Sequence, residues 1–160
     1  MRKKLLSLLC IICMLFPFLI FTSCQQAATP QITMQQIQDA IEDSENPNIV
    51  DADVSDFSFT NEFLTSFGWA MLFERNNVST EHLTAIDCYT YEVVHDGDST
   101  TYSYTIRVFK FFAPEDAEAC KNGYDFGSAY RTKTYGNLLV SAHVLLSDFA
   151  FGVIDGIEAE

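Results

Sequence analysis

Two segments rich in aromatic residues, IDCYTYEVVH at residues 86–95 and TYSYTIRVFKFF at residues 101–112, carry the strongest structural signal in this chain of 160 residues. Both contain several Tyr, Thr or Val residues, which favour β-strands because their branched or flat side chains pack well on a pleated surface. Asp96-Gly97 lies between them, and this dipeptide is common in hairpin turns. The sequence therefore predicts two antiparallel strands joined by a loop of more than two residues.

The second of these strands has two faces of different character, because side chains alternate along a strand. One face carries large apolar or aromatic residues, which are Tyr102, Tyr104, Ile106 and Val108. The opposite face carries polar residues, which are Ser103, Thr105 and Arg107. We therefore expect one face of the sheet to form the core and the other to be partly exposed to water.

Two helix starts are visible on either side of the strands. Thr33, with Gln36 three residues later, has the pattern of a capping box and predicts a helix over residues 33–43. Pro114 is followed by acidic residues, which favour the first turn of a helix because they lie near the positive end of its dipole. This second helix is expected to end at a glycine, at position 123 or 127.

The remaining elements complete a mixed pattern. Segments 130–135 and 138–146 predict a second hairpin that turns at Gly136-Asn137, and Ser147 or Asp148 would cap a last helix. That helix carries an apolar stripe of Phe149, Val153, Ile154 and Ile157. Residues 57–59 favour a short strand, while residues 60–75 fit a helix or a strand. This order predicts an α+β domain, with an antiparallel sheet and helices packed on one face.

The chain is acidic, with 22 Asp and Glu residues against 9 Lys and Arg residues. Three of the basic residues precede Cys24, so the chain from Cys24 onward has a net charge of −16. This charge argues against nucleic acid as a partner, because phosphates require clustered Lys and Arg. It also argues against electrostatic docking on anionic lipids. The simplest interpretation is a well-solvated surface.

The beginning of the chain has the three-part pattern of a secretory signal. Arg2, Lys3 and Lys4 come first, residues 5–21 are almost wholly apolar, and small residues then lead into Cys24. An uncleaved membrane anchor is the alternative, since the apolar run is close to the about 20 residues that a membrane span needs. Both interpretations place the rest of the chain outside the cytoplasm.

Residues 22–24, Thr-Ser-Cys, resemble the lipobox of bacterial lipoproteins, with Phe21 where that family usually has Leu. The resemblance implies a signal peptide at residues 1–23 and a lipidated Cys24 followed by a polar tether to residue 32. A single α+β domain would then occupy residues 33–160. It also implies a location on the extracytoplasmic side of the cell membrane, with the membrane as partner through the acyl anchor.

The latter half of the chain, over residues 102–157, also resembles small uncharacterised α+β lipoproteins of the bacterial envelope. The likeness is carried by FKFFAPEDA at residues 109–117 and by GNLLV at residues 136–140. That family implies neither an activity nor a role for any residue.

Two cysteines, Cys88 and Cys120, lie in the domain itself. Export permits a disulfide between them, but lone cysteines on apolar faces are at least as often separate buried thiols. Both alternatives stay open because pairing cannot be deduced from the sequence.

Two groups of polar residues are candidates for metal or proton chemistry. The first has part of the ligand spacing of a calcium loop and consists of Asp51, Asp53, Ser55 and Glu62. Asp56 stands where such a loop needs glycine, so we expect a solvated acidic connection instead of a metal site. The second lies around the predicted hairpin turn and consists of Glu92, His95, Asp96 and Asp98. An imidazole beside carboxylates could move protons, although a polar turn is the favoured interpretation.

Known catalytic motifs are missing from the sequence. It contains no serine nucleophile elbow, no phosphate-binding glycine loop and no dinucleotide fingerprint. The sequence therefore favours a non-catalytic binding or interaction domain without a cofactor, whose partner would be an envelope protein, a peptide or a glycan. Four tyrosines could form its surface, although core packing is favoured for them: Tyr89, Tyr91, Tyr102 and Tyr104. The alternative function is a small envelope hydrolase that works through two carboxylates.

Overall fold

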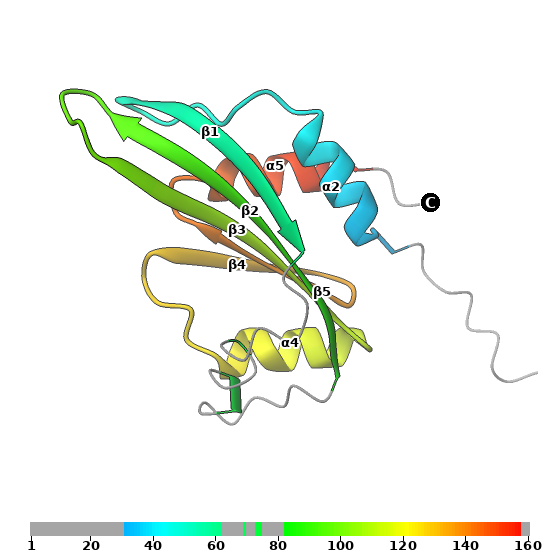
Figure 1. The fold of residues 1–160 in the computed structure, drawn as a ribbon. Helices are drawn as coiled ribbons and strands as arrows, with labels where there is room; N and C mark the ends of the chain where they lie inside the picture. Colours follow the sequence, from blue (N-terminus) through cyan, green and yellow to red (C-terminus); the bar gives the residue numbers. More distant parts are fainter. Residues whose placement is uncertain (1–30, 62–68, 70–72, 75–81, 158–160) are drawn as a thin grey trace, which may run out of the picture. The chain divides into compact units, whose positions relative to one another are not determined.

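Five antiparallel strands in the order β1-β2-β3-β5-β4 form one sheet (Figure 1). The computed structural model describes residues 31–61, 69, 73–74 and 82–157. The strands are β1 Ala52–Asn61, β2 Leu83–His95, β3 Thr101–Phe111, β4 Tyr130–Tyr135 and β5 Leu138–His143. The helices are α2 Met34–Glu42, α4 Pro114–Gly123 and α5 Ser147–Asp155. The α+β class and the antiparallel sheet predicted from the sequence are therefore confirmed.

The hairpin of β2 and β3 forms as the sequence predicts. The two strands pair antiparallel from Leu83 opposite Phe111 to Val94 opposite Thr101. Gly97 lies in the turn with a φ of +78°, a backbone conformation that L side chains rarely adopt. The turn is closed by a hydrogen bond of 2.9 Å from the Asp98 amide to the His95 carbonyl.

One detail of the fold prediction is wrong, because the helices pack on both faces of the sheet and not on one (Figure 1). Helices α2 and α5 share one cluster of buried residues with Tyr89 and Val108. Helix α4 belongs to a second cluster, together with Phe109 and Leu139.

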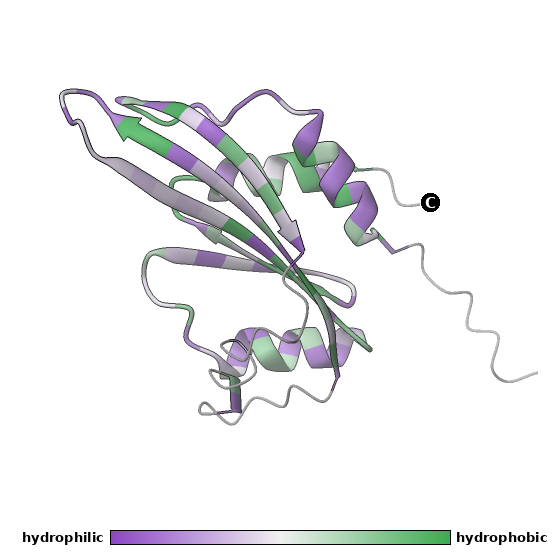
Figure 2. Cartoon of the chain, in the orientation of Figure 1, coloured by the Kyte–Doolittle hydropathy of each residue, from purple (hydrophilic) through white to green (hydrophobic). Residues whose placement is uncertain are grey.

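The reason for this arrangement lies in β3, whose second face changes character along the strand. It is polar from Ser103 to Arg107 and apolar at Phe109 and Phe111, so its apolar end needs a cover of its own. Figure 2 shows β3 pale near its turn with β2, with green residues farther along the strand.

The predicted capping box of the first helix is confirmed. The Gln36 amide donates to the Thr33 side-chain oxygen at 3.2 Å, and the Thr33 amide donates to the Gln36 side-chain oxygen at 2.9 Å. Ile37 and Ile41 lie one helical turn apart and are buried. The cap therefore fixes where α2 begins, and the two isoleucines attach it to the core.

The last two helices differ in how well their starts are predicted. Helix α4 begins at Pro114 as expected, with the Ala113 amide donating to the Asp116 carboxylate at 3.2 Å. Helix α5 is not capped by Ser147 or Asp148, because its N-cap is Leu146. Ser147 is instead buried in the first turn, where its hydroxyl donates to the Val144 carbonyl at 3.0 Å.

Strand β1 is longer than the short strand expected around residues 57–59, and its pairing with β2 is irregular between Val54 and Asp56. Thr60 and Asn61 end this strand, so the first two residues of segment 60–75 are extended. Most of the rest of that segment lies outside the described residues.

We predict that Tyr89→Phe stabilises the domain. The Tyr89 side chain is fully buried, and its hydroxyl makes no hydrogen bond to any residue in the described part of the chain. Burial and the charge of Asp87 raise the pKa of this hydroxyl. A buried polar group without a partner costs about 1–3 kcal/mol, so its removal should raise the free energy of unfolding by about 1 kcal/mol.

The matched control is Tyr135→Phe, which removes a hydroxyl that donates to Asp155 at 3.0 Å. This change should lower the free energy of unfolding by about 0.5–1.5 kcal/mol. Urea unfolding of both variants measures the difference. A Tyr89→Phe protein no more stable than wild type would show that the hydroxyl has a partner in solution.

Candidate functional site

A cavity of about 120 Å³ opens on the face of the sheet that α4 covers. Its described lining comes from several elements: Trp69, Arg107, Tyr124, Phe126, Tyr130 and Ser141. Three of these residues belong to the sheet, since Arg107 lies in β3, Ser141 in β5 and Tyr130 at the start of β4. The cavity therefore has a floor of strands and walls of aromatic rings.

Strand register brings the floor residues together. Arg107 is directly opposite Ser141 on β5, and Cys88 of β2 is opposite Arg107 on its other side. β3 is the middle strand of the five, so Arg107 sits at the centre of the sheet. A charged side chain at that position is unusual, because central strands are the most deeply buried part of a small sheet.

The guanidinium of Arg107 is held by two contacts. Its Nη1 donates to the Thr105 hydroxyl at 2.8 Å, and its central carbon lies 5.2 Å from the Trp69 ring centroid in a cation–π contact. Its Nε is shielded from solvent and has no hydrogen-bond partner among the described residues. No carboxylate among the described residues forms an ion pair with Arg107.

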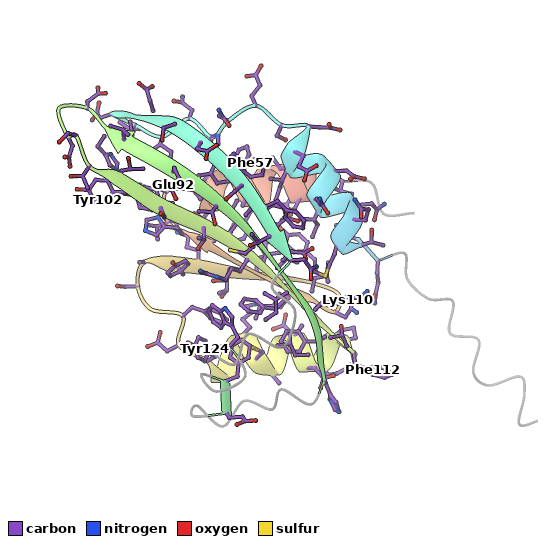
Figure 3. All side chains as sticks on the ribbon, in the orientation of Figure 1. Phe57, Glu92, Tyr102, Lys110, Phe112 and Tyr124 are labelled. Atoms are coloured by element: carbon purple, nitrogen blue, oxygen red, sulfur yellow. The ribbon has the colours of Figure 1, made fainter. Side chains whose placement is uncertain are left out.

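The walls of the cavity are part of a wider aromatic cluster. Tyr124, the C-cap of α4, lies on the α4 side of the sheet (Figure 3) and packs edge-on against Phe73 and Phe126, with ring centroids 4.9 and 4.6 Å away. The Trp69 ring packs edge-on against Phe109 at 5.1 Å. Burial raises the pKa of the Tyr124 hydroxyl, so this group is a neutral hydrogen-bonding group at neutral pH. These packed rings give the cavity apolar walls.

A histidine and a tyrosine lie beside the cavity. His143 contacts the lining residue Tyr130 at a ring distance of 5.6 Å and stacks on Tyr104 at 4.4 Å. The Leu145 amide donates to His143 Nδ1 at 3.3 Å, so Nε2 holds the proton in the neutral ring. Burial lowers the pKa of His143 from its ordinary value of 6.5. This imidazole is therefore neutral at pH 7.

The calcium-loop candidates do not form a loop. Asp53 and Ser55 lie within β1, and the Ser55 hydroxyl donates to the Glu92 carbonyl at 3.1 Å. An extended strand cannot wrap its side chains around one cation. Asp51 precedes the strand with a φ of +56°, and Glu62 lies outside the described residues.

Three of the polar residues predicted around the β2–β3 turn make contacts within that hairpin, near Glu92 and Tyr102 in Figure 3, and one of them, His95, has its Nε2 2.8 Å from the Tyr104 hydroxyl. Asp98 accepts from the Thr100 amide at 2.9 Å and from the Tyr102 hydroxyl at 2.8 Å. Glu92 accepts from the Ser103 hydroxyl at 2.7 Å. Within the described ranges, no three His, Cys, Asp or Glu side chains are placed to hold a metal ion.

Three of the four tyrosines considered as a binding surface belong to the core. Tyr89 and Tyr91 are buried and the partly buried Tyr104 packs against the cluster that contains them, whereas Tyr102 is 39% exposed. Cys88 and Cys120 are both buried, and no disulfide joins them. Burial raises the pKa of the Cys120 thiol to about 12, which makes it a poor nucleophile.

Sequence reasoning placed Arg107 on the polar face of its strand but did not single it out as a site residue. The available signal was an arginine within an otherwise uncharged run of strand residues, Thr101–Val108.

Cys24, the expected lipidation site, lies outside the described residues, and none of the helices that are described is long and apolar enough to cross a membrane. No family model, curated protein or solved structure matches this chain.

We predict that lowering the pH from 7.5 to 5.5 destabilises the domain partly through His143. Its pKa is lowered in the folded state, so the unfolded chain takes up the proton first as the pH falls. The free energy of unfolding therefore keeps its full value above the unfolded pKa of about 6.5 and decreases as the pH falls below it. Urea unfolding at both pH values should show a smaller loss for His143→Gln than for wild type. Equal losses would contradict this prediction.

A second prediction concerns the two thiols. Because Cys88 and Cys120 are buried and not bridged, a reductant should leave the melting temperature unchanged. Iodoacetamide at pH 8 should modify both residues only after denaturation, as peptide mapping by mass spectrometry would show. A peptide pair linked through these two cysteines would contradict it.

Proposed function

We propose that this protein is a lipid-anchored, extracytoplasmic lipoprotein whose α+β domain is a non-catalytic binding module. The cavity around Arg107 is the observation that supports binding. It combines aromatic walls with one cationic group that lacks an ion-pair partner among the described residues. Ligand sites are typically apolar hollows with a few polar groups that fix orientation, and this cavity has that composition.

The anchoring part of the proposal rests on the sequence. Three positive residues, an apolar run and Thr22-Ser23-Cys24 fit a lipobox signal. A single acyl chain gives only marginal membrane binding, of about 10⁴ M⁻¹, so a diacylated cysteine would be needed for a firm attachment. The acidic domain would add no attraction to anionic lipid.

A carboxylate-dependent hydrolase receives less support from the cavity. That chemistry requires two carboxylates facing each other across the substrate, about 5–9.5 Å apart. The described lining of the cavity contains one guanidinium and two kinds of hydroxyl, and no carboxylate. A binding role therefore fits the described lining better than hydrolysis does.

We predict that Cys24→Ala abolishes lipid attachment. The variant should leave either a precursor held by residues 5–21 or a soluble form that is cut elsewhere, because the acyl acceptor is gone. Lipid labelling, membrane fractionation and mass spectrometry of the N-terminus measure this in a bacterial host. Cys13→Ala is the matched control, since it changes a cysteine inside the signal and should leave lipidation intact. A wild-type N-terminus without lipid would contradict the anchoring proposal.

The binding proposal is tested separately, with a chemically diverse set of small molecules. Trp69 is the only tryptophan of the chain and lines the cavity, so its fluorescence reports directly on an occupant. We expect at least one compound to change this fluorescence in a saturable way with the full-length protein in detergent. Ser141→Leu should abolish the change, because the larger side chain fills the cavity. Absence of any saturable ligand would contradict a binding role for this cavity.

A further inference from the structure

We propose that the cavity binds a carboxylate that bears one aromatic ring or an apolar group of similar size, with Arg107 as its anion contact. This inference rests on the proposed function, since it names the ligand class of the same cavity. It is carried by three observations: Arg107 has no ion-pair partner among the described residues, one edge of its guanidinium is unused by their side chains, and the walls are apolar and enclose a small volume.

The first observation is that Arg107 is exceptional among the cations that the structure describes. Three of the others, Lys121, Arg131 and Lys133, each have a carboxylate within 4 Å. Lys110 is exposed to solvent. Arg107 is half-buried and has no carboxylate partner in the described part of a chain with 22 acidic residues. A desolvated cation without a counter-ion is costly, and a bound anion would remove that cost.

The second observation is which edge of the guanidinium is already used. Nη1 donates to Thr105, whereas neither Nε–H nor Nη2 makes a hydrogen bond to a side chain that the structure describes. Nε–H and Nη2–H point in the same direction and form the edge that a carboxylate grips with both oxygens. Arg107 lines the cavity, so this unused edge belongs to the side chain that an anion in the cavity would meet.

The third observation is the size and chemistry of the walls. A dry apolar cavity of about 150 Å³ takes one benzene ring, so this cavity of about 120 Å³ is too small for more than one ring. Trp69, Tyr124 and Phe126 present rings to it. Aromatic ligands gain from edge-on or offset contacts with such rings. A group of one ring is therefore the largest apolar part that fits beside the carboxylate.

Two other ligand classes fit less well. Aromatic cages also bind quaternary ammonium groups, but Arg107 already lies over the Trp69 ring and would repel a second cation. A phosphate dianion would meet more repulsion from the acidic surface than a monoanion does. The acid surplus also means that selectivity must come from contacts within the cavity and not from long-range attraction.

The test uses the fluorescence of Trp69 in the full-length protein in detergent, excited at a wavelength that the ligands do not absorb. Benzoate is titrated against benzamide, its neutral analogue, and against benzyltrimethylammonium. N-acetylphenylalanine and its amide repeat the comparison for the carboxyl end of a peptide. We expect saturable binding of at least one acid, with its neutral analogue at least about tenfold weaker. Whichever acid binds more tightly identifies a free small acid or a peptide terminus as the source of the carboxylate.

Arg107→Gln should weaken binding of that acid by at least about tenfold and leave binding of its neutral analogue nearly unchanged. The matched control is Arg131→Gln, which removes the same charge from an exposed position paired with Asp148 and should bind like wild type. Ser141→Leu, which keeps Arg107 but fills the cavity, should bind neither acid nor analogue. This second variant tests the site independently if Arg107→Gln does not fold, as judged by its melting transition.

The proposal is overturned if acids and amides bind equally, if Arg107→Gln binds like wild type, or if only the ammonium compound binds. In those cases the cavity still binds a ligand, so the proposed function stands while its ligand class is wrong. It is also overturned if none of these compounds binds. The proposed function then fails only if the diverse compound set also gives no ligand.

Discussion

The pairing of β2 with β3 supports every other element of the domain. These two strands pair from Leu83–Phe111 to Val94–Thr101, and each carries a further strand on its outer side, β1 on β2 and β5 on β3. Backbone groups are therefore paired on both sides where the outer strands reach, over residues 87–94 of β2 and 106–110 of β3, and side chains there can be buried without unpaired amides. The helices have no sheet to pack on without this pair.

The central strands also divide the core in two. Side chains alternate between the faces, so Ile106 and Val108 face α2 and α5, while Phe109 and Phe111 face α4. On the α4 side the strand becomes polar at Arg107, and α4 with its aromatic cluster covers the apolar end. The cavity lies at this boundary, where the aromatic cluster meets the polar part of the sheet.

Arg107 is the charged residue at this boundary, and its contacts explain only part of why it is there. The cation–π contact with Trp69 and the hydrogen bond to Thr105 hold its guanidinium, but neither supplies a negative charge. A partly desolvated charge without a counter-ion adds little to stability, so stability alone gives little reason for an arginine here. A ligand that completes the ion pair gives a reason, and this links the packing of the sheet to the proposed binding role.

The sequence by itself determined the local elements of this protein. Periodicity and turn chemistry located the β2–β3 hairpin, the Gly136 turn and the start of α4, and Thr33 with Gln36 located the start of α2. These signals are local, because a cap or a turn depends on residues a few positions apart. The tertiary structure alone decided which face each helix covers, that α5 begins after Leu146 without a Ser147 cap, and that Arg107 lines one cavity with Trp69, Tyr124 and Ser141. Those contacts join residues far apart in the chain, and their geometry follows from strand register and from packing of both faces at once.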